Sequence, residues 1–274
     1  MVGKKYPMRV EVTQSIKTDV PNQSRPEVQE VKINQGFDIS AVKELENGGR
    51  QLEMRFENEK IDVLQGSQSV LNFDSTQSTA GDANNPAAPV LRAALGAPIQ
   101  YFTDANGKVE RMEGVDELTR RVAAAESPQT HGHFREMFSE TTLRRYGSFA
   151  DIMPNRVVKT GESWNYKDDV PTSVGVMMVD MKYTFKDWQE HDGHQCAHVT
   201  GKGECSTKSA SAATGVLVEV KKGKITGEFW YDPALGMIVG SSDDQDMTLK
   251  ITTRQQTMSS QFNQNVQVAL VDAP

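Results

Sequence analysis

The chain has 274 residues, of which 30 are Lys or Arg and 37 are Asp or Glu, so its formal net charge is −7. This acidic balance argues against a general nucleic-acid binder and against a protein held on a membrane by a polybasic surface. Mean hydropathy is −0.55, and no apolar run approaches the roughly 20 residues of a membrane-spanning helix. The length allows one or two domains and a core that folds without a metal or a disulfide.

Alternation of apolar and polar residues is the dominant pattern along the chain. It predicts strands with one apolar face and one polar face, as in an antiparallel sheet with one side in water or lining a cavity. The pattern is clearest over 177–185, where Met177, Met181 and Phe185 share one face and Lys182 lies on the other. The same alternation occurs over 8–12, 31–39, 52–56, 225–231, 247–251 and 266–270.

A change of parity interrupts the third of these strands. Its apolar positions move from even numbers, ending at Phe56, to odd numbers, beginning at Ile61. A bulge or turn near Asn58 and Glu59 would account for the shift, because one extra residue in a strand reverses the faces of the residues that follow.

Turns with glycine are predicted between the strands, because tight hairpins require positive φ angles. The predicted turns are 47–49, 104–107, 192–193, 222–223 and 232–236.

Helices are predicted in the centre of the chain. Val115, Leu118 and Val122 share one face of a helix over 115–125. The other helical stretches are 134–146 and, for a turn or two, 90–95.

The order of strands, a central helical pair and further strands indicates one α+β domain over 1–274. We expect a curved antiparallel sheet of about ten strands, with two or three helices against one face. The helical insert is expected at about 114–147. The polar segment at about 74–89 has no periodicity and is predicted to be a mobile surface loop.

The two cysteines, Cys196 and Cys205, leave two alternatives open. If Gly201 and Gly203 form a hairpin turn between them, the cysteines face each other and a disulfide is feasible. If the segment is one continuous strand, their odd separation places them on opposite faces and no bond forms.

Candidate chemistry is sparse in the sequence. The run 191–198 contains His191, His194, Cys196 and His198, which are ligand types that zinc and copper prefer. Its spacing fits no standard zinc pattern, so a hairpin that carries exposed histidines is the favoured interpretation. His131 and His133 give a still weaker signal.

The acidic runs 168–169 and 243–246 lack the features of a calcium loop, so solvated turns are the favoured interpretation. The sequence also lacks the motifs of serine hydrolases, phosphate loops, dinucleotide folds and zinc proteases. We therefore assign no catalytic residue, no cofactor and no metal ligand, and expect a protein that is not an enzyme. A hydrolase with paired carboxylates is kept as the third hypothesis, although nothing in the sequence singles out a pair.

Three sequence blocks carry a resemblance to a known group of proteins. The blocks are 96–118, 153–164 and 227–236. In this order they resemble a family of uncharacterised bacterial exported proteins and lipoproteins, which is similar in pattern to the lipoprotein carriers LolA, LolB and RseB. The resemblance implies a strongly curved half-barrel with helices across its concave face, an apolar cavity between the two, and a location in the periplasm or cell envelope.

The leading hypothesis is therefore non-enzymatic binding of a lipid or acyl chain in a cavity between sheet and helices. Candidate lining residues are Phe134, Met137, Phe138, Trp164, Met177 and Met181. For the three aromatic residues and Met137, packing in the core is the favoured alternative. The alternative is a structural or interaction module with a filled core, which would bind another envelope protein and no small molecule.

Overall fold

The computed structural model describes residues 2–128, 130, 134, 137–147, 150–172, 175–210 and 215–271. Its strands are β1 Lys5–Asp19, β2 Glu27–Glu44, β3 Arg50–Gln65, β4 Gln68–Asp74, β5 Pro98–Thr103, β6 Val109–Glu113, β7 Ser163–Thr172, β8 Gly175–His191, β9 His194–Ala210, β10 Leu217–Asp232, β11 Met237–Thr252 and β12 Thr257–Leu270. Its helices are the 3-10 helix η1 Thr79–Asn84 and the α-helices α1 Ala88–Ala94, α2 Val115–Ala125 and α3 Glu140–Gly147.

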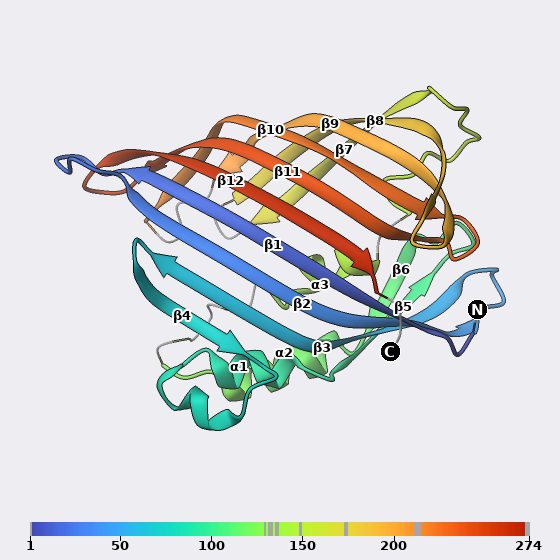
Figure 1. The fold of residues 1–274 in the computed structure, drawn as a ribbon, viewed down its shortest axis with the longest axis horizontal. Helices are drawn as coiled ribbons and strands as arrows, with labels where there is room; N and C mark the ends of the chain where they lie inside the picture. Colours follow the sequence, from blue (N-terminus) through green and yellow to red (C-terminus); the bar gives the residue numbers. More distant parts are fainter. Residues whose placement is uncertain are drawn as a thin grey trace.

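The strands form one open, curved, antiparallel sheet (Figure 1). Their order is β6-β5-β3-β2-β1-β12-β11-β10-β9-β8-β7, and β4 pairs with β3 beside this path. The first and last strands are thus neighbours in the middle of the sheet, where the amide of Val271 donates a hydrogen bond to the carbonyl of Pro7 at 2.8 Å. The α+β class and the curved sheet expected from the sequence are confirmed, with twelve strands in place of about ten.

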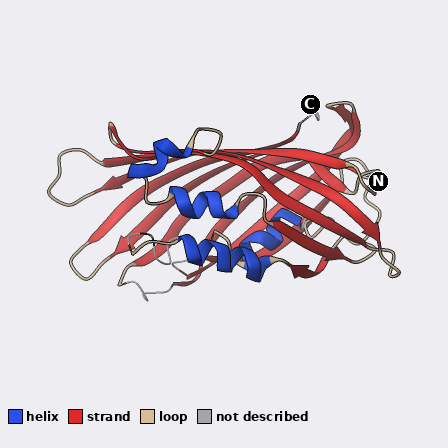
Figure 2. Cartoon of the chain, turned by 90° about the horizontal axis from the view of Figure 1, so that it is seen from below, coloured by secondary structure: helices blue, strands red, loops and turns tan. Residues whose placement is uncertain are grey.

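The α-helices lie against one face of the sheet (Figure 2) and cover the part built from β1, β2, β3 and β5. Leu118 of α2 and Leu143 of α3 are fully buried in one cluster with Met54, Phe56 and Ile99 of the sheet. This half of the sheet therefore has a filled core. None of the described helices is long and apolar enough to cross a membrane.

Helix α2 occupies the predicted range, Val115–Ala125. It begins after Gly114, whose φ of +89° suits glycine, and a Cβ at this position would collide with the carbonyl oxygen of Pro98. Asp116 and Glu117 lie in the first turn, where negative charge interacts favourably with the helix dipole.

The predicted bulge in the third strand is confirmed. Gly36 of β2 pairs with Asn58, whereas Phe37 pairs with Phe56, so Glu57 is the extra residue in β3. Because of this bulge, Glu59 turns into the core and is 4 % exposed. Burial raises the pKa of its carboxyl to about 7, although a hydrogen bond from Gln35 at 3.3 Å favours the ionised form.

Three local predictions differ from the structure. The turn predicted at 222–223 is wrong, because Gly223 lies inside the continuous strand β10, next to an irregularity between Val220 and Lys222. The segment expected as a loop at 74–89 contains η1 and the start of α1. Helix α3 begins at Glu140, later than expected; part of the predicted stretch lies outside the described residues.

Arg92 holds the segment before α1 in place. Its guanidinium forms an ion pair with Asp82 at 2.5 Å and donates hydrogen bonds to the carbonyl oxygens of Ser75 and Gln77 at 2.9 and 3.0 Å. A side chain with several donors can thus order a segment that has no apolar periodicity, which is why periodicity alone predicted a loop.

The second of the two cysteine alternatives is the one observed. Strand β9 is continuous from His194 to Ala210, and Cys196 and Cys205 are both buried and free. Their odd separation places them on opposite faces of this strand.

Candidate ligand-binding groove

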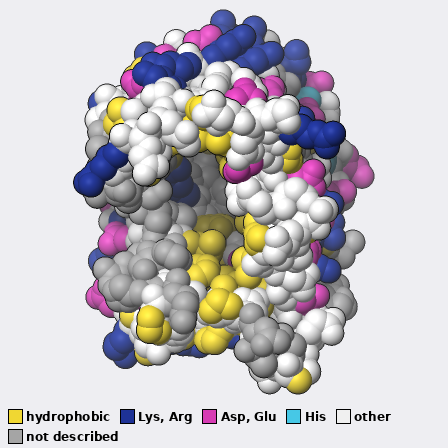
Figure 3. Space-filling model, turned by 90° about the vertical axis from the view of Figure 1, so that its left-hand side faces the viewer, with side chains coloured by type: hydrophobic (Ala, Val, Ile, Leu, Met, Phe, Trp, Pro, Cys, Tyr) yellow, Lys and Arg dark blue, Asp and Glu magenta, His cyan; other side chains and the backbone are white. Residues whose placement is uncertain are grey.

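The concave face of the sheet is only partly covered by the helices. Over β8 to β12, Met181, Cys205, Ile225 and Met247 form a cluster made of strand residues alone. Seen from the end where the β1–β2 and β11–β12 hairpins lie, the molecule is hollowed, and hydrophobic side chains are visible inside (Figure 3). We call this hollow and the strand faces around it the groove.

Half-buried apolar side chains share the concave face with this cluster. The strand registers place them side by side, because residues paired across strands point to the same side of a sheet. They are Val12, Ile16, Val31, Tyr166, Val179, Tyr183, Val220, Leu249, Phe262 and Val266. The groove therefore offers apolar side chains on both sides of a polar row, Gln14, Gln264 and Gln245, that crosses β1, β12 and β11.

Glycines flatten the concave face of β9 and β10. A Cβ at Gly201 would stand 2.7 Å from Cε1 of Tyr183, and a Cβ at Gly203 would stand 2.6 Å from Sδ of Met181. A Cβ at Gly223 would collide with Sγ of Cys205. These glycines let large neighbouring side chains lie flat on the backbone, which is a common role of glycine where a sheet bends or another group approaches closely.

Asp243 brings a carboxyl into the groove. Asp243 is half-buried on the concave face of β11, opposite Gly227 of β10 and Val266 of β12. Burial, followed by the charge of Asp244, raises the pKa of Asp243 to about 6. The strand also carries Gln245, whose neighbour Gln264 donates a hydrogen bond to Gln14 at 3.3 Å.

The sequence interpretation of 243–246 as a solvated turn is wrong, since the run lies inside β11. The period of two separates it into Asp243 and Gln245 on the concave face and Asp244 and Asp246 on the opposite face. Extending the alternation of 247–251 backwards by four residues would have found Asp243. The other acidic run, 168–169, likewise lies in a strand, β7.

Three of the predicted lining residues lie on the groove side of β7 and β8. Met177 and Met181 share one face of β8, and Trp164 of β7 pairs with Tyr183 on the same side. The ring centroids of Trp164 and Tyr183 are 5.9 Å apart, and Nε1 of Trp164 donates a hydrogen bond to the carbonyl of Ile152 at 2.8 Å.

The other three predicted lining residues lie elsewhere. Phe138 is buried in the filled, helix-covered core, with its ring 6.5 Å from that of Phe56. Phe134 packs against the same core, and Met137 is exposed. These side chains belong to the helix layer and not to the open half of the concave face.

The histidines of the 191–198 run have partners within the protein. The ring of Trp230 stacks with those of His191 and His198, with centroid distances of 4.1 and 5.1 Å. His198 contacts Glu228 at 2.8 Å, and His194 contacts Asp232 at 2.8 Å. Among the described residues, no group of three or more His, Cys, Asp or Glu could hold a metal ion. His131 and His133 lie outside the described residues.

Comparison with known families gives one match over most of the chain. A model described as a family of unknown function, DUF6263, matches residues 47–238. The chain belongs to the DUF6263 family. The matched region runs from the β2–β3 turn to the start of β11, so β1, β2 and β12 of this DUF6263 protein lie outside it.

Among solved structures, the DUF6263 protein is similar to lipovitellin, in a structure reported for its lipid–protein interactions. The TM-score is 0.51 at 9 % identity, and the alignment covers 100 % of this chain but 26 % of the lipovitellin chain. At this identity the similarity concerns the fold alone, and this chain spans about a quarter of lipovitellin.

A DUF1329 family protein from Desulfovibrio piger aligns over 99 % of this chain and 88 % of its own at 6 % identity. Its TM-score of 0.15 is too low to support a comparison of folds. No curated protein matches the sequence.

Proposed function

We propose that this protein binds an apolar ligand, a lipid or an acyl chain, in the groove and catalyses no reaction. The observation that carries the proposal is the open half of the concave face, where apolar side chains face a hollow and not a helix. The fold similarity to lipovitellin, a protein studied for its lipid–protein interactions, supports a lipid as the ligand.

Hydrophobic burial would drive binding. Each methylene removed from water contributes about 0.8 kcal/mol, so an acyl chain offers ample free energy to offset the loss of its own freedom. Met177 and Met181 suit such a ligand, because flexible thioethers adapt to chains of different shape.

The proposal includes a location in the periplasm or cell envelope and a mode of action like that of LolA, LolB and RseB. Its support is the resemblance of the three sequence blocks to exported bacterial proteins. Fractionation of cells that express the native gene tests the location. Recovery of the protein from the cytoplasmic fraction would contradict it.

The decisive experiment is titration of the protein with a dansyl-labelled undecanoic acid, followed by fluorescence. Leu249 faces the groove from β11, whereas Thr248 faces the other side of the same strand. We expect Leu249→Arg to weaken probe binding by tenfold or more, because it places a charge where the chain would lie. The matched control Thr248→Arg adds the same charge outside the groove and should leave binding unchanged.

Two results would overturn the proposal. One is the absence of any fluorescence change with the folded protein, together with no lipid retained in native mass spectrometry after incubation with envelope lipid extract. The other is equal binding by the Leu249→Arg and Thr248→Arg variants, which would place the probe outside the groove.

The second candidate function is a protein-interaction module, favoured by the half of the concave face that is already filled. Phe138 and Leu143 are buried there among sheet residues. Light scattering coupled to size exclusion separates the two candidates, since a stable oligomer or co-eluting protein favours the module and a ligand-binding monomer favours the carrier.

A further inference from the structure

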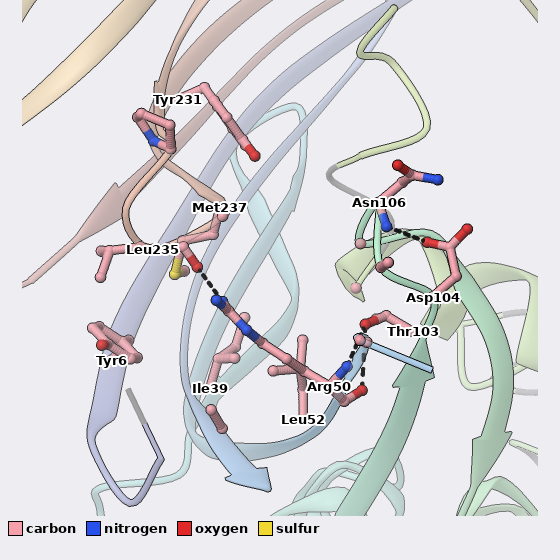
Figure 4. Close-up of a pocket in the computed structure, with 18 residues that line it drawn as sticks. Tyr6, Ile39, Arg50, Leu52, Thr103, Asp104, Asn106, Tyr231, Leu235 and Met237 are labelled. Carbon is pink, nitrogen blue, oxygen red and sulfur yellow. Dashed lines mark hydrogen bonds between the residues drawn. The ribbon is translucent and has the colours of Figure 1, made fainter. Parts of the chain in front are cut away.

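A second cavity lies at the opposite end of the sheet from the opening in Figure 3. It has a volume of about 220 Å³ and is formed where the β10–β11 turn meets the β2–β3 and β5–β6 hairpins (Figure 4). Ile39, Leu52, Leu235 and Met237 give it apolar walls. We call it the Arg50 pocket, after the cation that crosses it.

Arg50 is the first residue of β3, and its side chain extends across the cavity (Figure 4). Its Nη1 donates a hydrogen bond to the carbonyl oxygen of Leu235 at 2.9 Å. No carboxylate of the described residues pairs with it. A guanidinium carries five N–H donors in a planar fork, so most of its donors are free to bind a ligand.

Two phenol side chains face the same cavity. Tyr6 is only 6 % exposed, and its hydroxyl has no hydrogen-bond partner within the described part of the chain. A buried donor without a partner costs about 1–3 kcal/mol, so it commonly marks the place of a water or ligand. Tyr231 lines the cavity together with Arg50. Burial raises the pKa of its phenol, and the charge of Arg50 partly opposes the rise.

We propose that the Arg50 pocket binds a small organic carboxylate, with the guanidinium and the Tyr6 hydroxyl on the carboxylate and the apolar walls around its body. The guanidinium fork matches a carboxylate in shape and charge. The volume is below the ~300 Å³ of the smallest drug-sized pockets, yet above the ~150 Å³ that holds one benzene. A ligand of the size of benzoate therefore fits both the chemistry and the space.

One acidic side chain also lines the cavity. Asp104 accepts hydrogen bonds from the backbone amides of Asn106 and Lys108, both at 2.9 Å, and these bonds lower its pKa. Its charge is thus stabilised by the amides of its own turn, and the carboxylate lies away from the end of the Arg50 side chain (Figure 4). The carboxylate is therefore expected at the Leu235 side of the cavity.

The test compares benzoate with benzamide, its neutral isostere, by protein-observed NMR titration of the full chain. We expect benzoate to shift amide resonances around the cavity in a saturable way and benzamide to bind at least tenfold more weakly. Arg50→Gln should abolish benzoate binding. Arg9→Gln is the control, because it removes the same charge from an exposed site away from the cavity.

A second variant tests whether the Tyr6 hydroxyl contacts the ligand or is only an unpaired buried group. Tyr6→Phe should weaken benzoate binding several-fold while the free protein becomes no less stable, because the unpaired hydroxyl is removed. The proposal is overturned if benzoate and benzamide bind alike, if Arg50→Gln retains benzoate, or if Tyr6→Phe leaves its affinity unchanged. These outcomes are independent of the groove, since the dansyl probe and Leu249→Arg report on the other end of the sheet.

Discussion

The ring of Tyr101 in β5 lies flat against Gly147 of α3, and its hydroxyl donates a hydrogen bond of 2.7 Å to the carbonyl of Leu143. A Cβ at Gly147 would stand 2.5 Å from Cδ1 of the ring. Helix α3 can therefore approach the sheet this closely only because residue 147 has no side chain.

We expect Gly147→Ala to lower the free energy of unfolding by about 1–3 kcal/mol, as for other overpacked core positions. The expected loss is informative because replacing glycine by alanine within a helix normally stabilises it, by up to about 1 kcal/mol. Urea unfolding measures the change. Thr141→Ala, on the exposed side of α3, is the control, and a Gly147→Ala variant as stable as this control would contradict the packing described.

The buried carboxyl of Glu59 should make the protein less stable as the pH rises. Its pKa is about 7 in the folded protein against 4.5 for the free group. The folded state therefore holds the proton more tightly, and stability is lost between about pH 4.5 and 7, by roughly 3 kcal/mol in total. Urea unfolding of the wild type and of Glu59→Gln at pH 5 and pH 8 measures this loss.

We expect Glu59→Gln to remove most of the pH dependence and to be the more stable protein at pH 8. Glu57→Gln is the matched control, because Glu57 is the exposed bulge residue two positions away. If the free energy of unfolding of both variants changes between pH 5 and pH 8 as that of the wild type does, the loss of stability does not come from the carboxyl of Glu59.

Ligand binding in the groove should itself depend on pH. An acyl chain placed beside Asp243 would remove water from a carboxyl whose pKa is already raised to about 6. Because this desolvation destabilises the ionised form of Asp243, the affinity for the dansyl probe should fall as the pH rises through about 6. Asp243→Asn should bind with an affinity that is constant over this range.

Asp246→Asn is the control for that titration, since Asp246 is exposed on the opposite face of β11. An affinity that falls equally in wild type and Asp243→Asn would assign the pH dependence to the probe or to another group.

The two thiols should be unreactive in the folded protein. Burial raises the pKa of Cys196 to about 11, with smaller contributions from Asp232 and Asp192, and burial also raises that of Cys205. Since the thiolate is the reactive form, Ellman's reagent at pH 8 should label neither residue until the chain unfolds. Unfolding without a reductant should then release both thiols, and release of none would reveal a disulfide.

The strands were the most predictable part of the fold, because each has one apolar and one polar face along its length. The parity change between Phe56 and Ile61 was enough to locate the bulge that buries Glu59. Gly223 was misread as a turn because a glycine that makes room for a neighbour across the sheet looks the same in sequence as one that reverses the chain.

The site was only partly predictable. Alternation placed Met177 and Met181 on one face of a strand, and in the structure Trp164 of the neighbouring strand lies on the same side. It could not show which half of that face the helices cover, since coverage depends on curvature and on the path of the helical insert. The Arg50 pocket left no local signal, because Tyr6, Arg50 and Tyr231 are brought together only when distant hairpins meet.

The pairing of β1 with β12 has a consequence for how the molecule assembles. Strands β1 to β6 form one half of the sheet and strands β7 to β12 the other. Among the described strands, the two halves pair with each other only through β1 and β12, over residues 5–19 and 257–270. This pairing brings together segments almost a full chain length apart, which is entropically the slowest contact to form. We therefore expect the two halves of the sheet to form separately and the pairing of β1 with β12 to form last. Destabilising mutations along this pairing should then slow folding less than they speed unfolding.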